Sequence, residues 1–220
     1  IPIYNEEDNI IKLSKSIYEA LSDIDYEVLF INDGSTDKSE KIIESISQAH
    51  SNIKLISLRR NYGQTAAMQA GFDHSKGEII IPMDGDLQND PNDIPLLIAK
   101  INEGYDVVSG WRKDRSDKKL TRILPSKIAN SLISRISGIY LHDYGCTLKA
   151  YRREILNDIK LYGEMHRFIP IYASWEGAKV TEIPVRHHAR IAGYTKYGLS
   201  RIPKVVLDIL VIRFFDKSLD

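Results

Sequence analysis

Short apolar runs alternate with amphipathic segments through the first hundred residues, and this alternation constrains the fold more than any other feature. The apolar runs have the length of buried strands and lie at residues 1–4, 28–31, 53–58, 78–83 and 107–109. The segments between them carry apolar residues at helical spacing, at residues 7–21, 42–46, 64–74 and 94–101. Strands that alternate with helices build right-handed βαβ units. The sequence therefore predicts an α/β fold with a mainly parallel, twisted sheet and helices on both of its faces.

Polar residues near the predicted helix starts are candidates for helix caps. Asn5 is a plausible cap for the first helix, and Ser35 or Thr36 can cap the second. Asn92 or Asp93 lies near the start of the fourth helix. These residues set the expected helix boundaries.

Beyond residue 111 the alternation stops and the pattern predicts other elements. Residues 118–138 have the spacing of one helix, and residues 180–185 have the pattern of a late strand. Pro184 restricts that strand to an edge or an end, because proline cannot donate to a sheet ladder. Residues 199–220 predict a C-terminal amphipathic helix, which fits either a membrane interface or docking on the core.

Composition places the chain among soluble globular proteins and excludes several classes. The 30 basic and 30 acidic side chains cancel, so no net field favours nucleic acid as a partner. Cys146 is the single cysteine, which excludes an internal disulfide. No signal peptide is visible, and no apolar stretch approaches the roughly 20 residues that span a bilayer. Because residue 1 already lies in an expected strand, we interpret the chain as a fragment.

Charge is concentrated in one segment despite this overall balance. Between Arg112 and Arg135, eight Lys or Arg residues accompany only Asp114 and Asp117. One interpretation is a solvated helix face. The other is a surface for an anionic partner, either a phosphate or a membrane headgroup layer.

Two carboxylates, Asp84 and Asp86, follow the apolar run at residues 78–83 directly. In open α/β sheets, ligands bind at the carboxyl ends of the strands. An oxygen-rich site with few protein ligands suits Mg²⁺ or Mn²⁺ shared with substrate phosphates, and Gln88 can add a neutral oxygen. An EF-hand loop is excluded because the glycine and glutamate that it requires are missing. The pair therefore predicts metal-assisted chemistry on a diphosphate.

Other polar residues are expected on the same rim of the sheet. Asp33 follows the second strand and could accept a hydrogen bond from a nucleotide base, or it could belong to a helix cap with a glycine turn. The first strand ends in Tyr4 and Glu6 in place of a glycine-rich phosphate loop, which suits stacking and ribose or base contact. The diphosphate is then held by metal and basic side chains.

Basic candidates for that role lie in two places. Arg112 follows the fifth strand directly, and Arg190 and Lys196 belong to a segment with the composition of a mobile phosphate-binding lid. Solubility is the alternative reason for basic residues in such a surface loop. A zinc site is rejected, because the cysteine and histidine spacing matches no pattern of zinc ligands.

Residues 2–7, 32–37 and 84–88 resemble, in order and spacing, the motifs of glycosyltransferase family 2, which has the GT-A nucleotide-sugar fold. Residues 143–153 and 193–197 resemble the dolichyl- and polyprenyl-phosphate sugar synthase branch. The resemblance implies a catalytic domain over residues 1–198, with a nucleotide-sugar half at about 1–111 and an acceptor half at about 112–198. Residues 199–220 would form a juxtamembrane amphipathic helix.

The resemblance also implies roles for individual residues. The nucleoside-binding set is Pro2, Tyr4, Glu6 and Asp33. The Mg²⁺ or Mn²⁺ ligands are Asp84, Asp86 and Gln88, and Gly85 belongs to the same nucleotide-sugar-binding loop. The donor phosphates are bound by Arg112, Arg190 and Lys196, and the lipid phosphate by Arg122 and Ser126. The catalytic set is Asp86, Arg112 and Asp143, where Asp143 either orients the acceptor or acts as a base.

The implied activity is metal-dependent, inverting transfer of a sugar from a UDP- or GDP-linked donor to a polyprenyl phosphate, at the cytoplasmic side of a membrane. The domain would be peripheral or part of a membrane protein. One alternative is a soluble family 2 transferase with a glycan hydroxyl acceptor. The other is a non-catalytic nucleotide- or membrane-binding module.

Overall fold

The computed structural model describes residues 1–113, 130–131, 133–135, 137–157 and 159–189. The first sheet contains β1 (Pro2–Ile3), β2 (Val28–Asn32) and β3 (Ile53–Ser57), all parallel and in that order. The connecting helices are α1 (Ile10–Ala20) and α2 (Ser39–Ala49), and α3 (Gln64–His74) follows β3. The predicted βαβ units are therefore present.

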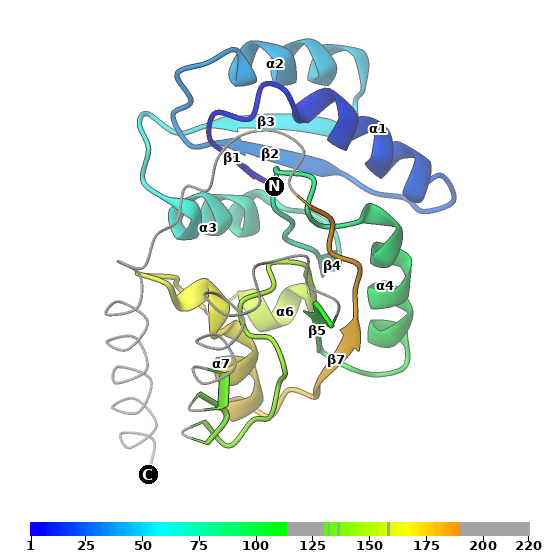
Figure 1. Ribbon diagram of the computed structural model, residues 1–220, viewed down its shortest axis with the longest axis vertical. Helices are drawn as coiled ribbons and strands as arrows, with labels where there is room; N and C mark the ends of the chain where they lie inside the picture. Colours follow the sequence, from blue (N-terminus) through cyan, green and yellow to red (C-terminus); the bar gives the residue numbers. More distant parts are fainter. Residues whose placement is uncertain (114–129, 132, 136, 158, 190–220) are drawn as a thin grey trace.

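Helices cover both faces of this sheet because β2 alternates its side chains between two cores. Phe30 packs into the cluster that contains Ile10 of α1 and Ile43 of α2. Its neighbour Ile31 packs into a separate cluster with Ala67 of α3. Successive side chains of a strand point to opposite faces, so α2 and α3 lie on opposite sides of the strands (Figure 1).

The second sheet has the order β4-β6-β5-β7. Its strands are β4 (Ile79–Ile80), β5 (Val107–Trp111), β6 (Lys149–Arg152) and β7 (Val180–Pro184). β6 runs antiparallel to both of its neighbours, and β7 runs parallel to β5 at the edge. The predicted edge position of the late strand is confirmed. The sequence did not predict β6, and it extended β4 beyond its two paired residues.

Three helices accompany this sheet: α4 (Ile94–Asn102), α6 (Arg153–Leu156) and α7 (Ile169–Trp175). Two 3₁₀ turns are η1 (Pro91–Asp93) and η3 (Met165–Arg167). One apolar cluster contains Ile3 and Phe30 of the first sheet together with Val108 and Ala150 of the second. The two sheets therefore share a core, which fixes the loops at their ends relative to each other.

The predicted caps of the first two helices are wrong, because the cap candidates bind each other. The Asn5 amide donates to Ser35 Oγ at 3.0 Å, and the Thr36 amide donates to Asn5 Oδ1 at 2.7 Å. The helices begin later, at Ile10 and Ser39, and no side chain caps either of them. Hydrogen bonds between the two loops thus replace the expected local caps.

Two predicted elements lie largely or wholly outside the described residues: the helix at 118–138 and the amphipathic helix at 199–220. Within the part of the chain that the structure describes, none of the helices combines the length and the apolar character needed to cross a bilayer.

Candidate active site

The loops that follow β1 and β2 lie side by side, which brings the first two predicted motifs together. The sheet register places Ile3 beside Asn32, so both strands end at the same edge. Beyond that edge, the Glu6 amide donates to Ser39 Oγ at 2.9 Å. The predicted nucleoside-binding residues therefore share one rim: Pro2, Tyr4, Glu6 and Asp33.

Asp33 holds the loop that precedes α3. Its side chain is buried, and its two oxygens accept hydrogen bonds from the amides of Tyr62 (2.7 Å) and Gly63 (2.9 Å). Burial raises the pKa of Asp33 above its ordinary value, although both amides act in the opposite direction. Gly34 has φ +68°, and a Cβ there would lie 2.5 Å from the Arg60 carbonyl carbon. The glycine turn is therefore needed for this close approach.

The Asp84–Gln88 loop follows β4, and a residue of α3 positions its first carboxylate. Asp84 Oδ1 accepts a hydrogen bond from Gln64 Nε2 at 2.8 Å. Asp86 Oδ1 accepts one from the Gln88 amide at 3.2 Å. Because Asp33 binds the loop directly before α3 and Asp84 binds the first residue of α3, the two predicted carboxylate motifs lie on a common rim.

Gly85 allows this loop to pack against β1. A Cβ at Gly85 would lie 2.6 Å from Ile3 Cδ1 and 3.3 Å from the Pro2 carbonyl oxygen. Two residues further on, Leu87 has φ +61°, a left-handed conformation that is uncommon for a leucine. The structure thus gives Gly85 a packing reason, and its predicted role in nucleotide-sugar binding stays a prediction.

The donor set of this loop fits a divalent cation that shares its shell with substrate. Asp84, Asp86 and Gln88 are all partly exposed, and Asp84 Oδ2 accepts no hydrogen bond from the described residues. The part of the chain that the structure describes contains no cluster of three or more His, Cys, Asp or Glu side chains suited to a metal. Mg²⁺ is commonly bound by one or two carboxylates, with phosphates and water completing its shell. The residues present fit that arrangement.

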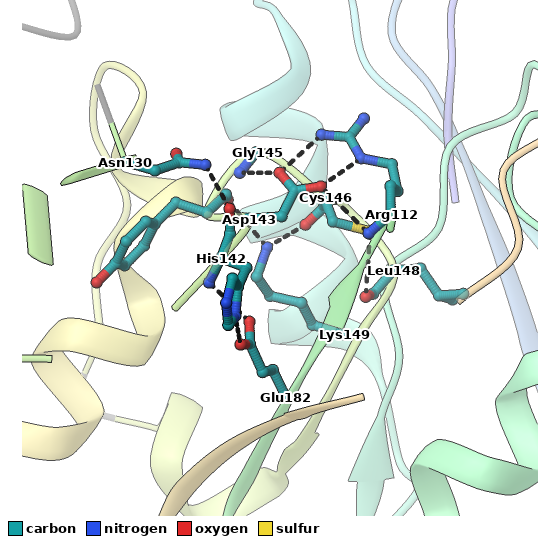
Figure 2. Close-up of polar contacts among 10 residues, drawn as sticks. Arg112, Asn130, His142, Asp143, Gly145, Cys146, Leu148, Lys149 and Glu182 are labelled. Carbon is teal, nitrogen blue, oxygen red and sulfur yellow. Dashed lines mark hydrogen bonds and ion pairs between the residues drawn. The ribbon is translucent and has the colours of Figure 1, made fainter. Parts of the chain in front are cut away.

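Arg112 and Asp143, both predicted to be catalytic, form a buried bidentate ion pair. Arg112 Nε donates to Asp143 Oδ2 at 2.7 Å and Nη2 donates to Oδ1 at 2.9 Å (Figure 2). The Gly145 amide donates to the same Oδ1 at 3.1 Å. Burial alone would lower the pKa of Arg112, but Asp143 raises it above its ordinary value and Asp84 acts in the same direction. Arg112 therefore stays cationic within electrostatic range of the Asp84–Gln88 loop.

Lys149 is a buried cation beneath this pair, and sequence reasoning assigned it no role. It is 2% exposed, and its Nζ donates to the carbonyl oxygens of Tyr144, at 3.1 Å, and Cys146 (Figure 2). Burial lowers its pKa to about 8, and Cys146 and Asp143 oppose that shift. The sequence carried no local signal for this role, because Lys149 begins β6 and no apolar run marks that strand. Lys149 fixes the loop that presents Asp143.

A second polar network joins the Asp84–Gln88 loop to the segment after β7. The His188 amide donates to the Gln88 carbonyl oxygen at 2.9 Å, and His188 Nε2 lies 3.1 Å from Asp90 Oδ2. Arg186 donates to Asp93 Oδ1 through Nε at 2.9 Å and Nη2 at 2.7 Å. These contacts hold residues 186–188 against the carboxylate loop.

Four predicted phosphate-binding residues lie outside the described residues: Arg122, Ser126, Arg190 and Lys196. The structure brings the other predicted site residues to neighbouring loops at the strand ends. It adds Gln64, which binds the Asp84 carboxylate, and Lys149, which binds backbone carbonyl oxygens of the loop that presents Asp143.

The chain resembles solved structures along most of its length. A glucosyl-3-phosphoglycerate synthase from Mycobacterium tuberculosis, in complex with Mn²⁺, UDP and phosphoglyceric acid, matches with a TM-score of 0.69 at 18% identity. The match covers 96% of this chain and 76% of that one. The element order and this likeness define an α/β protein of the GT-A fold.

The chain belongs to glycosyl transferase family 2, whose model matches residues 1–160. It is 43% identical over 221 residues to a dodecaprenyl-phosphate galacturonate synthase of Rhizobium johnstonii, covering 98% of this chain and 65% of that protein. It is 44% identical over 214 residues to an undecaprenyl-phosphate 4-deoxy-4-formamido-L-arabinose transferase of Salmonella choleraesuis, covering 96% and 65%. The chain thus spans just under two thirds of the length of these relatives.

Proposed function

We propose that this chain transfers a sugar from a nucleoside-diphosphate sugar to a polyprenyl phosphate, with Mg²⁺ or Mn²⁺ at the Asp84–Gln88 loop. The observation that carries the proposal is the position of Arg112. This buried cation pairs with Asp143 and lies within electrostatic range of Asp84. It therefore connects the carboxylate rim with the predicted acceptor half. Both curated relatives are named for sugar transfer to a polyprenyl phosphate, which supports this acceptor class.

On the donor side, Asp84, Asp86 and Gln88 would hold the cation and, through it, the diphosphate. A bound divalent cation would supply Lewis-acid stabilisation of the leaving diphosphate. Arg112 adds a fixed positive charge close to the place where negative charge develops, and Asp143 keeps its guanidinium oriented. We assign the nucleoside contacts to the rim residues named above, and the reaction is proposed to invert the anomeric carbon.

On the acceptor side, the chemistry requires little help from a base. The second pKa of a phosphate monoester lies near about 6, so the acceptor is largely anionic at pH 7. Asp143 directs both of its oxygens at Arg112. We therefore assign Asp143 to the orientation of Arg112 and not to proton removal. Arg122 and Ser126 are proposed contacts of the lipid phosphate, and Arg190 and Lys196 of the donor phosphates.

The proposed acceptor is a membrane lipid, which places the reaction at a membrane surface. We propose the cytoplasmic side, with residues 1–198 as the catalytic domain and residues 199–220 as an amphipathic helix in the interface. The domain is either peripheral or the soluble part of a membrane protein.

A transfer assay with the full chain tests the proposal. The chain is incubated with Mn²⁺ and labelled nucleotide sugars, and either undecaprenyl phosphate or a neutral oligosaccharide is supplied as acceptor. The expected product is a labelled lipid formed by the wild type and by Asp23→Ala, which removes an exposed carboxylate on another loop. Asp86→Ala should form none while keeping its circular dichroism spectrum. Label on the oligosaccharide would identify a hydroxyl-acceptor transferase, and donor binding without any product would identify a binding module.

A further inference from the structure

Gly145 lies at the point where three charged groups of the site converge. A Cβ placed on Gly145 would lie 3.2 Å from Arg112 Nη2, 3.5 Å from Asp143 Oδ1 and 3.7 Å from Arg167 Nη1. The backbone of Gly145 is not left-handed, so its conformation does not require glycine. Glycine is favoured here for a steric reason, because any side chain would fill the region between two guanidinium groups.

Arg112 has hydrogen-bond donors to spare for a ligand. A guanidinium carries five N–H donors in a planar fork. Asp143 accepts from Nε and from Nη2. Among the described residues, no acceptor contacts Nη1 (Figure 2). Arg112 is therefore oriented by the protein on one edge and can bind an anion on another.

Arg167 brings a second guanidinium to the same place from a different element. It ends η3, its Nε donates to Glu164 Oε2 at 3.2 Å, and its side chain is about one quarter exposed. Burial lowers the pKa of Lys149, and the positive charges of Arg112 and Arg167 lower it further. The three cations therefore lie within electrostatic range of one another. Asp143 pairs with Arg112, Glu164 pairs with Arg167, and Asp84 lies within electrostatic range of Arg112.

We propose that Arg112 and Arg167 form a phosphate-binding subsite, with Gly145 as its floor, for the terminal phosphate of the acceptor. This inference rests on the proposed function. Two guanidinium forks can each donate to the oxygens of one phosphate monoester, whereas a neutral hydroxyl group needs neither positive charge. The subsite belongs to the acceptor because Gly145 and Arg167 both come from the part of the chain after β5. Arg112 alone is shared with the Asp84–Gln88 loop.

Equilibrium binding of farnesyl phosphate to the full chain tests this assignment. Removal of one charge-assisted contact predicts that Arg167→Gln binds farnesyl phosphate about 10-fold or more weakly than the wild type. Arg167→Lys should recover part of that loss, since it restores the charge without the fork. Farnesol, which lacks the phosphate, should bind wild type and Arg167→Gln equally. Mn²⁺ with UDP or GDP, whichever the wild type binds, should retain its affinity in both variants.

Arg152→Gln supplies the matched control. Arg152 also pairs with one carboxylate, that of Asp106, and is similarly exposed, but it lies at the other end of β6. It should bind farnesyl phosphate as the wild type does. Gly145→Ala gives an independent variant, because its methyl group enters the subsite without removing a charge, and it should also weaken farnesyl phosphate binding.

Two outcomes would overturn the inference with the proposed function intact. One is wild-type farnesyl phosphate affinity in both Arg167→Gln and Gly145→Ala. The other is an equal loss of nucleotide and farnesyl phosphate affinity in Arg167→Gln, which would assign Arg167 to the donor or to general folding. A wild-type chain that neither binds farnesyl phosphate nor transfers sugar to a polyprenyl phosphate would instead refute the proposed function, and this inference with it.

Discussion

The burial of Lys149 leads to a quantitative prediction of how the free energy of unfolding changes with pH. Its pKa is lowered from 10.5 to about 8 by burial, so the folded protein releases this proton at a lower pH than the unfolded chain. Below about pH 8 both states are protonated, and the folded state carries the full cost of the buried ammonium group. At 1.36 kcal/mol per pKa unit, that cost is about 3 kcal/mol. Between about pH 8 and pH 10.5 the unfolded chain binds more protons, so stability rises with pH and the cost disappears.

Lys149→Met isolates this effect because it removes the titrating group and keeps most of the length of the side chain. The variant also leaves the Tyr144 and Cys146 carbonyl oxygens without their donor, which is a loss that does not depend on pH. Urea unfolding is measured at about pH 7 and about pH 10. Between these pH values, the free energy of unfolding of the wild type should rise by roughly 2 to 3 kcal/mol relative to that of Lys149→Met.

The control is Lys41→Met, which replaces an exposed lysine of α2. Its stability difference from the wild type should be the same at both pH values. The reasoning would be refuted if the free energies of unfolding of the wild type and Lys149→Met changed equally with pH. It would also be refuted if the variant became more stable relative to the wild type at high pH. Either result would mean that the ammonium group is not held in a desolvated position.

Two further substitutions test the packing of the site. Asp143→Asn leaves the mostly buried Arg112 without its anionic partner and should lower the free energy of unfolding by about 3 kcal/mol or more. Urea unfolding measures this change, and an unchanged free energy of unfolding would contradict the buried ion pair. Gly34→Ala combines a left-handed conformation with a contact of 2.5 Å to the Arg60 backbone, and should lower the melting temperature clearly more than Gly104→Ala. Gly104 is also left-handed but has open space around it, so equal losses would show that the contact contributes nothing.

The sequence predicts most of the fold because its local signals and its tertiary contacts agree. α3 occupies residues 64–74 as predicted, and the apolar runs become β1, β2, β3 and β5. β6 was missed because its four residues begin with a lysine and end with an arginine, so no apolar run marks it. Its burial depends on pairing with β4 and β5, which are distant in sequence. The failed caps have a similar cause, since polar loop residues found partners on the neighbouring loop.

For the site as well, the sequence predicts which residues take part but not which of them form pairs. Arg112 and Asp143 were both singled out from the sequence, but their ion pair was not predicted. They are 31 positions apart, and the antiparallel pairing of β5 with β6 brings them together, with Ser109 opposite Lys149. A carboxylate considered alone can be a base or an orienting group. The group that pairs with the carboxylate decides between these two roles, and the fold determines which group that is.

Binding of Mn²⁺, followed by electron paramagnetic resonance with and without a nucleoside diphosphate, tests the central claim most directly. The two carboxylates leave most of the cation's shell to phosphate oxygens and water. The account therefore predicts one Mn²⁺ site that binds more tightly when UDP or GDP is present and that is absent in Asp86→Ala. Tight Mn²⁺ binding that is indifferent to the nucleotide, or that persists in Asp86→Ala, would contradict a shared metal at the Asp84–Gln88 loop.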